Sequence, residues 1–292
     1  MTPILRFPSL LFALSALALP ASGQTLINNN FSTVTPGSYA ASTGEPFGVA
    51  NALGNATFED NPEVVSTGGV SNSAYLALTN TMGMRSRNTA NTTTTTTFSF
   101  NFLATQTDDN NDRGALGAGW NINPDNSDLH NASPAERDNR LLIGMRYVDG
   151  ATIADDFFQL GYMTEFNGSQ ITDFSAAPGD TVTFDAPDTE TWYSMSFDLT
   201  FNDLSNEWTV ANLSVLNGSS TEVATLASAT FANPSASLNT TTTANAVLAG
   251  WGDKNGINGF DNVDVTAIPE PTTGLLLLGG LGTLLVSAQR RR

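Results

Sequence analysis

The sequence predicts an all-β protein, a two-sheet sandwich or jelly roll, over residues 24–268. Thr and Asn are heavily used, Gly-rich or Asn-rich breaks recur along the chain, and no run of residues has the apolar spacing of an amphipathic helix. These 245 residues fit one large β domain or two small ones, and they suffice for a sizeable hydrophobic core. Because they include no cysteine, the stability of the fold must come from packing or bound ions.

Alternation of apolar and polar residues marks the strands. The threonine run Thr92–Thr97 followed by FSFNF predicts a strand with Phe98, Phe100 and Phe102 on one face. In Trp192–Phe201 the odd-numbered residues are all apolar, and the even-numbered ones are polar apart from the tryptophan. The other predicted strands are 140–148, 157–163, 207–216, 222–231, 246–252 and 259–268, and residues 24–91 are expected to supply the first strands of the same sandwich, with the first and last strands paired.

The N-terminal segment, residues 1–23, has the pattern of a secretory signal peptide. A single positive charge, Arg6, precedes an apolar core at Leu10–Leu19. Small residues follow at 21–23, where a signal peptidase would cleave, so the mature chain is expected to begin at Gln24. The alternative is an uncleaved N-terminal anchor.

The C-terminal segment, residues 269–292, reads as a membrane anchor. From Gly274 to Val286 every residue is Gly, Leu, Val or Thr, and three arginines end the chain. The apolar run is marginal in length, since a membrane helix takes about 20 residues. A run that is apolar on all sides and followed by positive charge is nevertheless typical of a transmembrane helix with a cytoplasmic stop. The alternative is a buried C-terminal helix.

The same segment begins with Pro269, Glu270 and Pro271. This triplet, the apolar run and the terminal arginines together resemble the PEP-CTERM sorting signal of Gram-negative bacteria. The resemblance implies recognition by an exosortase, a membrane protease or transpeptidase, and a link to exopolysaccharide or biofilm matrix. It also implies an exported protein, held transiently or stably in the inner membrane before it reaches the cell surface or matrix. A plain membrane anchor with a proline-containing linker is the alternative.

The middle of the chain carries a second resemblance. The hairpin at Trp192–Leu216 and the closing strand Gly259–Val265, which reads GFDNVDV, resemble concanavalin-A-like and laminin-G-like sandwiches. The resemblance implies that fold for residues 24–268. The expected organisation is therefore a signal peptide at 1–23, a β-sandwich domain, and a sorting segment at 269–292.

The charge of the chain is strongly acidic. The full sequence has 28 acidic and 11 basic residues, and its net charge is −17. Without Arg6, Glu270 and the three terminal arginines, 27 acidic and 7 basic residues remain, a net charge of about −20. Such a balance argues against nucleic acid as a partner, because binding it needs a basic face. The balance fits a soluble extracellular protein or one that collects divalent cations.

Three clusters of Asp and Asn are candidate Ca²⁺ ligands, because alternating carboxylate and amide oxygens on a tight loop can wrap a hard cation. The first contains Asp108, Asn110 and Asp112 in the pattern Asp-x-Asn-x-Asp-x-Gly, although it departs from the EF-hand loop. The members of the other two are Asn121, Asn123, Asp125 and Asp128, and Asp253, Asn255, Asn258 and Asp261. Solvated turns are the alternative interpretation of all three.

Little in the sequence supports catalysis. His130 is the single histidine, and the Gly-x-Ser-x-Gly elbow of serine hydrolases is missing. The Glu-x-Asp-x-x-Glu run that related glucanases of this fold carry is also missing, and Glu165, Glu190 and Glu207 are isolated. We therefore expect a protein without enzyme activity.

Tryptophans could instead stack on sugar rings if they lie on a concave face. Trp120 is the preferred candidate, since it follows Ala-Gly beside a polar loop, and core packing is its alternative role. The predicted function is that of a non-catalytic protein that binds carbohydrate or matrix. An extracellular polysaccharide hydrolase and a structural surface protein without a ligand are the alternatives.

Overall fold

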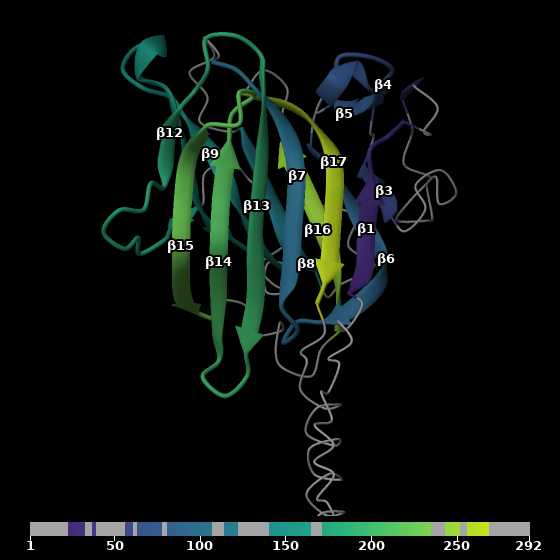
Figure 1. The fold of residues 1–292 in the computed structure, drawn as a ribbon, viewed down its shortest axis with the longest axis vertical. Coiled ribbons are helices and arrows are strands. Elements are labelled where there is room, and N and C mark those ends of the chain that lie inside the picture. Colours follow the sequence, from purple (N-terminus) through teal and green to yellow (C-terminus); the bar gives the residue numbers. More distant parts are fainter. Residues whose placement is uncertain are drawn as a thin grey trace, which may run out of the picture. The chain divides into compact units, whose positions relative to one another are not determined.

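Two antiparallel sheets pack face to face, with sheet A in front and sheet B behind it in Figure 1. The computed structural model describes residues 23–32, 37–38, 56–60, 63–77, 81–106, 114–121, 140–164, 171–234, 243–251 and 256–268. Residues Gly23–Ile268 form one unit. The predicted signal peptide up to Ser22 and the predicted sorting segment lie outside the described residues. Within the described ranges no helix is long and apolar enough to cross a membrane.

The strand order of both sheets is far from the order along the chain. Across sheet A it is β15 (Glu222–Ala232), β14 (Glu207–Leu216), β13 (Thr191–Asn202), β7 (Thr96–Ala104), β17 (Ile257–Ala267), β5 (Tyr75–Ala77), β4 (Glu63–Val65) and β2 (Gly37–Ser38), with β1 (Gln24–Asn29) also paired to β17. Across sheet B it is β11 (Thr172–Asp173), β10 (Phe157–Met163), β9 (Arg140–Val148), β8 (Ala115–Asn121), β16 (Thr243–Trp251), β6 (Thr81–Asn91) and β3 (Ala56–Asp60), with β12 (Thr183–Asp185) also paired to β10. Two 3-10 turns, η1 (Val70–Asn72) and η2 (Ile153–Asp155), lie in connections.

The predicted all-β two-sheet sandwich is confirmed, and so are most of its strands. The strands predicted at 140–148, 157–163 and 207–216 are β9, β10 and β14, and β9 pairs with β10. The later strands differ from their predicted bounds by one to three residues at their ends. Burial alternates along β14, so period-two alternation was a sufficient signal for this strand, which has one polar face.

The first and last strands pair, as the sequence predicts. β1 runs antiparallel to β17, from Gln24 opposite Ala267 to Asn29 opposite Val263. The described sandwich thus begins and ends side by side in the same sheet (Figure 1).

The threonine run is not a strand along its whole length, so this part of the prediction is wrong. β6 ends at Asn91, and β7 begins only at Thr96. The Asn91 side-chain oxygen accepts hydrogen bonds from the N–H and hydroxyl of Thr93 at 3.0 and 2.9 Å. An Asn side chain that bonds the backbone two residues ahead forms a turn, and this turn reverses the chain between the two sheets.

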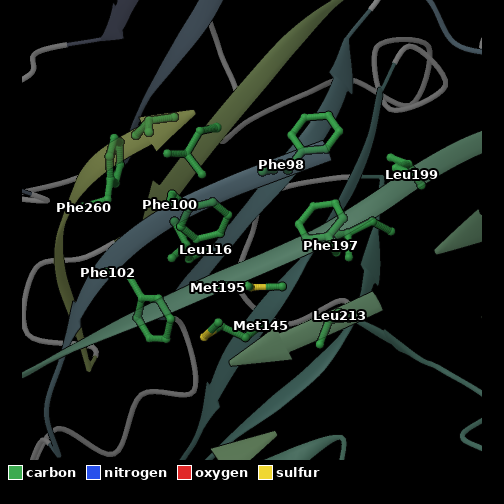
Figure 2. Packing of buried hydrophobic residues seen from close by; sticks show 14 of the residues in the cluster. Phe98, Phe100, Phe102, Leu116, Met145, Met195, Phe197, Leu199, Leu213 and Phe260 are labelled. Carbon is green, nitrogen blue, oxygen red and sulfur yellow. The ribbon is translucent and has the colours of Figure 1, made fainter. Parts of the chain in front are cut away.

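The core lies between the sheets and is rich in aromatic rings. The rings of Phe98, Phe100 and Phe102 project from β7 into it, as Figure 2 shows. Each of these side chains is at most 1% exposed. Phe98 stacks on Phe197 of β13, with ring centroids 5.1 Å apart. Burying one such side chain stabilises the fold by about 2 kcal/mol, so this aromatic row is a major part of what holds the sheets together.

The outer faces of the two sheets differ. In β13 buried and half-buried residues alternate, whereas every residue of β8 is buried. Sheet B is thus covered on both faces at its centre. Its outer face carries a second apolar cluster, whose buried members are Ala115, Leu142, Met163, Val247 and Ala249. The outer face of sheet A, in contrast, is polar along β13.

Candidate functional site

The outer face of sheet A carries a band of short polar side chains on its central strands, β7 and β13. The strands lie in register, so that Thr97 is opposite Asp198 and Ser99 is opposite Ser196. All the side chains of this band are half-buried. We call this band the polar track, and its members are Thr97, Ser99, Asn101, Ser194, Ser196, Asp198 and Thr200.

A carboxylate holds one end of the polar track in place. The Thr97 hydroxyl donates to Asp198 Oδ1 at 2.6 Å, and Asn212 Nδ2 donates to Oδ2 at 2.8 Å. Because the Thr97 hydrogen points to the carboxylate, the oxygen lone pairs of that hydroxyl are free to accept from another group. The hydrogen bonds to Asp198 therefore fix Thr97 and Asn212 in place, while the Thr97 hydroxyl can still accept a hydrogen bond from a ligand.

The middle of the track is different. The hydroxyls of Ser99, Ser194 and Ser196 make no hydrogen bond within the described part of the chain. Each such hydroxyl offers one donor and two acceptor positions. The polar track thus has oriented groups at one end and free ones at its centre.

Two aromatic rings close the other end of the track; we call them the aromatic corner. Trp192 of β13 and Tyr75 of β5 meet edge to face, with ring centroids 5.5 Å apart, and both rings are half-buried. The Tyr75 ring covers Gly259 of β17, where an added Cβ would lie 2.8 Å from the ring. Glycine at this position therefore allows the ring to lie flat on the sheet.

The loop between β4 and β5 is tied to this corner by two side chains. Trp192 Nε1 donates to the Gly68 carbonyl at 2.9 Å. Asp261 Oδ2 of β17 accepts from the Val70 N–H at 3.0 Å and from the Ser73 hydroxyl at 2.9 Å. The β4–β5 loop thus holds the indole ring of Trp192 in one orientation, and the loop itself is hydrogen-bonded to β17 through Asp261.

The same loop has an unusual backbone. Gly68, Ser71 and Asn72 have φ values of 99°, 59° and 61°. Left-handed conformations of non-glycine residues cost of order 1–3 kcal/mol in strained cases and persist where the surroundings determine them, as the bonds to Trp192 and Asp261 do here. Strained backbone of this kind clusters at functional sites, so the loop is a second indication that the aromatic corner is a binding site.

The carboxyl group of Asp261 is fully buried under the loop. Burial raises the pKa of Asp261 above its ordinary value, while hydrogen bonds from Asn262 N–H, the Ser73 hydroxyl and Val70 N–H act in the opposite direction. The anchor of the loop is therefore also a titratable group.

Further polar groups surround the aromatic corner. Asn258 Nδ2 donates to Glu190 Oε1 at 2.9 Å, and Asn262 Nδ2 donates to Asn101 Oδ1 at 3.1 Å. An exposed carboxylate and several amides next to half-buried rings can bind a ligand that has both apolar faces and hydroxyl groups.

Trp120 does not lie at this site. Its ring has no exposed surface and packs edge-on against Phe98 in the core, with centroids 5.8 Å apart. The prediction that Trp120 stacks on a ligand is therefore wrong, and the alternative, core packing, is what the structure has. Trp208 is also fully buried.

The other predicted site residues are mostly outside the described residues. These are Asp108, Asn110 and Asp112 of the first Ca²⁺ cluster and the triplet Pro269, Glu270 and Pro271. His130, to which the sequence assigns no site role, also lies outside the described residues. Over the ranges that the structure covers, no group of three or more acidic, His or Cys side chains could hold a metal ion. The described members of the third cluster, Asn258 and Asp261, bond to protein groups instead.

Sequence reasoning did not select Trp192, although a signal for it was present. This residue shares a face with Ser194, Ser196 and Asp198 in an alternating strand, which places it on the solvent side. A tryptophan on the polar face of an amphipathic strand is the pattern that would have found it.

No protein-family model and no curated protein matches the chain. Among solved structures it is similar to a seed lectin of Lotus tetragonolobus, at 7% identity and a TM-score of 0.43, over 81% of this chain and 100% of that one. It is also similar to lectin II from Ulex europaeus, at 10% identity and a TM-score of 0.43, over 81% and 99%. A legume lectin-like domain from Entamoeba histolytica gives 6% identity and a TM-score of 0.39, over 74% and 91%. These likenesses are distant and concern general architecture.

Proposed function

We propose that this protein is an exported, surface- or matrix-associated protein that binds carbohydrate through the outer face of sheet A and catalyses no reaction. The observation that carries the proposal is the aromatic corner. Trp192 and Tyr75 lie half-buried on a polar face, where alternation alone would place small or hydrophilic residues. Their position is supported by the loop that Asp261 anchors.

A sugar ring matches this chemistry. Its C–H groups form an apolar face that packs on an aromatic ring, and its hydroxyls donate to carboxylate and amide oxygens or accept from N–H groups. Glu190, Asn101 and Asn262 provide such oxygens and N–H groups around the rings. A site with aromatic area and a few placed polar groups is the usual form of a small-ligand site.

The export part of the proposal rests on the sequence. The signal-peptide pattern at 1–23 and the triplet at Pro269–Pro271 support passage across the inner membrane and processing by an exosortase-like enzyme. Ca²⁺ bound by Asp108, Asn110 and Asp112 is a further proposal of the same kind.

The test is glycan-array binding of the full-length chain in detergent, with wild type compared with Trp192→Ala. Loss of a central aromatic anchor is expected to cost about 2 kcal/mol, or roughly 30-fold in affinity. Leu204→Ala is the matched control, because Leu204 is 96% exposed and lies on the β13–β14 turn, away from the corner. An array on which wild type binds no glycan, or on which Trp192→Ala binds as well as wild type, would contradict the proposed site.

A further inference from the structure

We infer that the carbohydrate site extends from the aromatic corner along the polar track, and that its ligand is a long, uncharged, linear polysaccharide lying lengthwise on β7 and β13. This inference rests on the proposed function, because it specifies the ligand of the same site. It is carried by the length, flatness, bonding capacity and charge of the polar track.

The length of the track exceeds what a single sugar needs. Trp192 and Thr200 lie eight residues apart on one continuous strand, β13. At about 3.4 Å per residue, this separation is about 27 Å. A ligand that uses the whole surface must therefore span several sugar rings.

The track is flat as well as long. Its members are only Ser, Thr, Asn and Asp, and all are half-buried, so no long side chain rises from the sheet between Trp192 and Thr200. Neighbouring strands lie about 4.8 Å apart, which sets the two rows of polar groups close enough for one chain to touch both. An extended polymer can therefore lie along the strands without a steric block from these side chains.

The bonding groups favour hydroxyl-rich ligands. Ser99, Ser194 and Ser196 have hydroxyls that are unused within the described residues, and Ser99 lies directly opposite Ser196. Such groups both donate and accept, so they match sugar hydroxyls, which do the same. Ser99 and Ser196 lie at the middle of the track, four residues along β13 from Trp192 or about 14 Å, so a short sugar held at the aromatic corner does not reach them.

The charges exclude an acidic polymer. The polar track has one charged residue, Asp198, and Asp264 lies beside it opposite Ser99. The cationic residues that the structure describes, Arg85, Arg87, Arg140 and Arg146, are all on strands of sheet B. A polymer that carries carboxylates or phosphates would thus meet repulsion on this face, and none of the described cations lies there to offset it.

The charges also favour a neutral polymer over a cationic one. Both oxygens of Asp198 already accept from protein groups, and those of Asp264 accept from Thr266 at 3.1 Å and Asn28 at 2.7 Å. Carboxylates that are satisfied by neutral donors have less capacity left for an ammonium group.

The experiment measures the affinity of the full-length chain for neutral gluco-oligosaccharides of increasing length, as disaccharide, tetrasaccharide and octasaccharide. Wild type is expected to bind the octasaccharide at least about tenfold more tightly than the disaccharide. Ser196→Lys, which raises a charged side chain from the middle of the track, is expected to remove this gain and leave disaccharide binding unchanged. Ser228→Lys on the edge strand β15 is the control, since Ser228 is exposed and belongs to the same sheet.

The outcomes separate the inference from the proposed function. Equal affinities for all lengths, with binding still lost in Trp192→Ala, would show that ligands bind at the aromatic corner but not along the polar track. Length dependence that persists in Trp192→Ala would show binding along the track without the corner. No binding at any length would contradict both the inference and the proposed function. If Ser196→Lys instead splits a dimer in sedimentation experiments, the face is a contact between two copies, and the inference is wrong.

Discussion

Sheet A and sheet B are both antiparallel and share one core, but their outer faces differ in burial and polarity. On sheet A the residues that point away from the core are half-buried and polar, as along β13. On sheet B the corresponding residues of β8, and those of β9 up to Gly144, are buried, and they include Gly117 and Leu142. Among the described central strands, the outer face of sheet A is therefore more accessible to a ligand than that of sheet B, and the accessible face carries the aromatic corner.

The glycines of sheet B belong to this difference. A Cβ at Gly144 would lie 1.9 Å from the Leu116 carbonyl oxygen, and a Cβ at Gly119 would lie 2.0 Å from that of Leu141. The central strands of sheet B thus approach more closely than side chains allow. In sheet A, Gly259 lies on the outer face under an aromatic ring.

The largest change in stability is expected from a substitution on the core face of β7, compared with one on the outer face of the same strand. Phe98→Ala should lower the free energy of unfolding by about 4 kcal/mol, because it opens a cavity in the aromatic core. Its neighbour on the opposite face provides the control: Ser99→Ala should change it by less than about 0.5 kcal/mol. Urea denaturation of both variants measures the difference, and similar losses in the two would break the distinction between the faces.

The next effect tests the outer face of sheet B. Leu142→Ala should cost about 3 kcal/mol, since Leu142 is fully buried in the second apolar cluster. Ser196→Ala, at a central position of the outer face of sheet A, should be close to neutral. If denaturation shows that Leu142→Ala costs no more than Ser196→Ala, the two outer faces are equally open and the comparison fails.

The smallest effect concerns pH. Burial raises the pKa of Asp261, so the folded protein binds this proton more tightly than the unfolded chain does. Stability from this group should therefore be greatest at low pH and should fall as pH rises from the unfolded pKa through the raised folded one. Asp261→Asn should remove this part of the pH dependence.

The measurement is the difference in unfolding free energy between wild type and Asp261→Asn, followed from acid to neutral pH. Other acidic residues cancel in this difference, which isolates the loop anchor. A difference that stays constant over the whole range would mean that Asp261 does not titrate with a raised pKa.

The candidate site shows where sequence reasoning succeeds and where it fails. In β13 polar and apolar residues alternate, so the face of Trp192 could be predicted from its neighbours. In β8 every residue from Ala115 to Trp120 is apolar or glycine, so alternation contains no information on which way Trp120 points. The wrong choice of Trp120 follows from this loss of contrast in a strand that is buried on both sides.

Asp261 illustrates a second limit. Its local sequence, Asp-Asn-Val, reads equally well as a solvated turn, a cation site or a strand end. Its partners, Val70 and Ser73, are 191 and 188 residues away along the chain. No local pattern indicates a hydrogen bond over such a separation, so the role of this carboxylate appears only in the folded chain.

The sequence by itself determined the all-β class, the positions of the later strands and the hairpin of β13 and β14. These follow from local physics, since side chains alternate across a strand and Asn and Gly end it. Only the tertiary structure decided the order of strands in each sheet, which outer face is covered, and how a distant loop holds Trp192 in place. These depend on contacts between segments far apart in the chain, which local preferences do not specify.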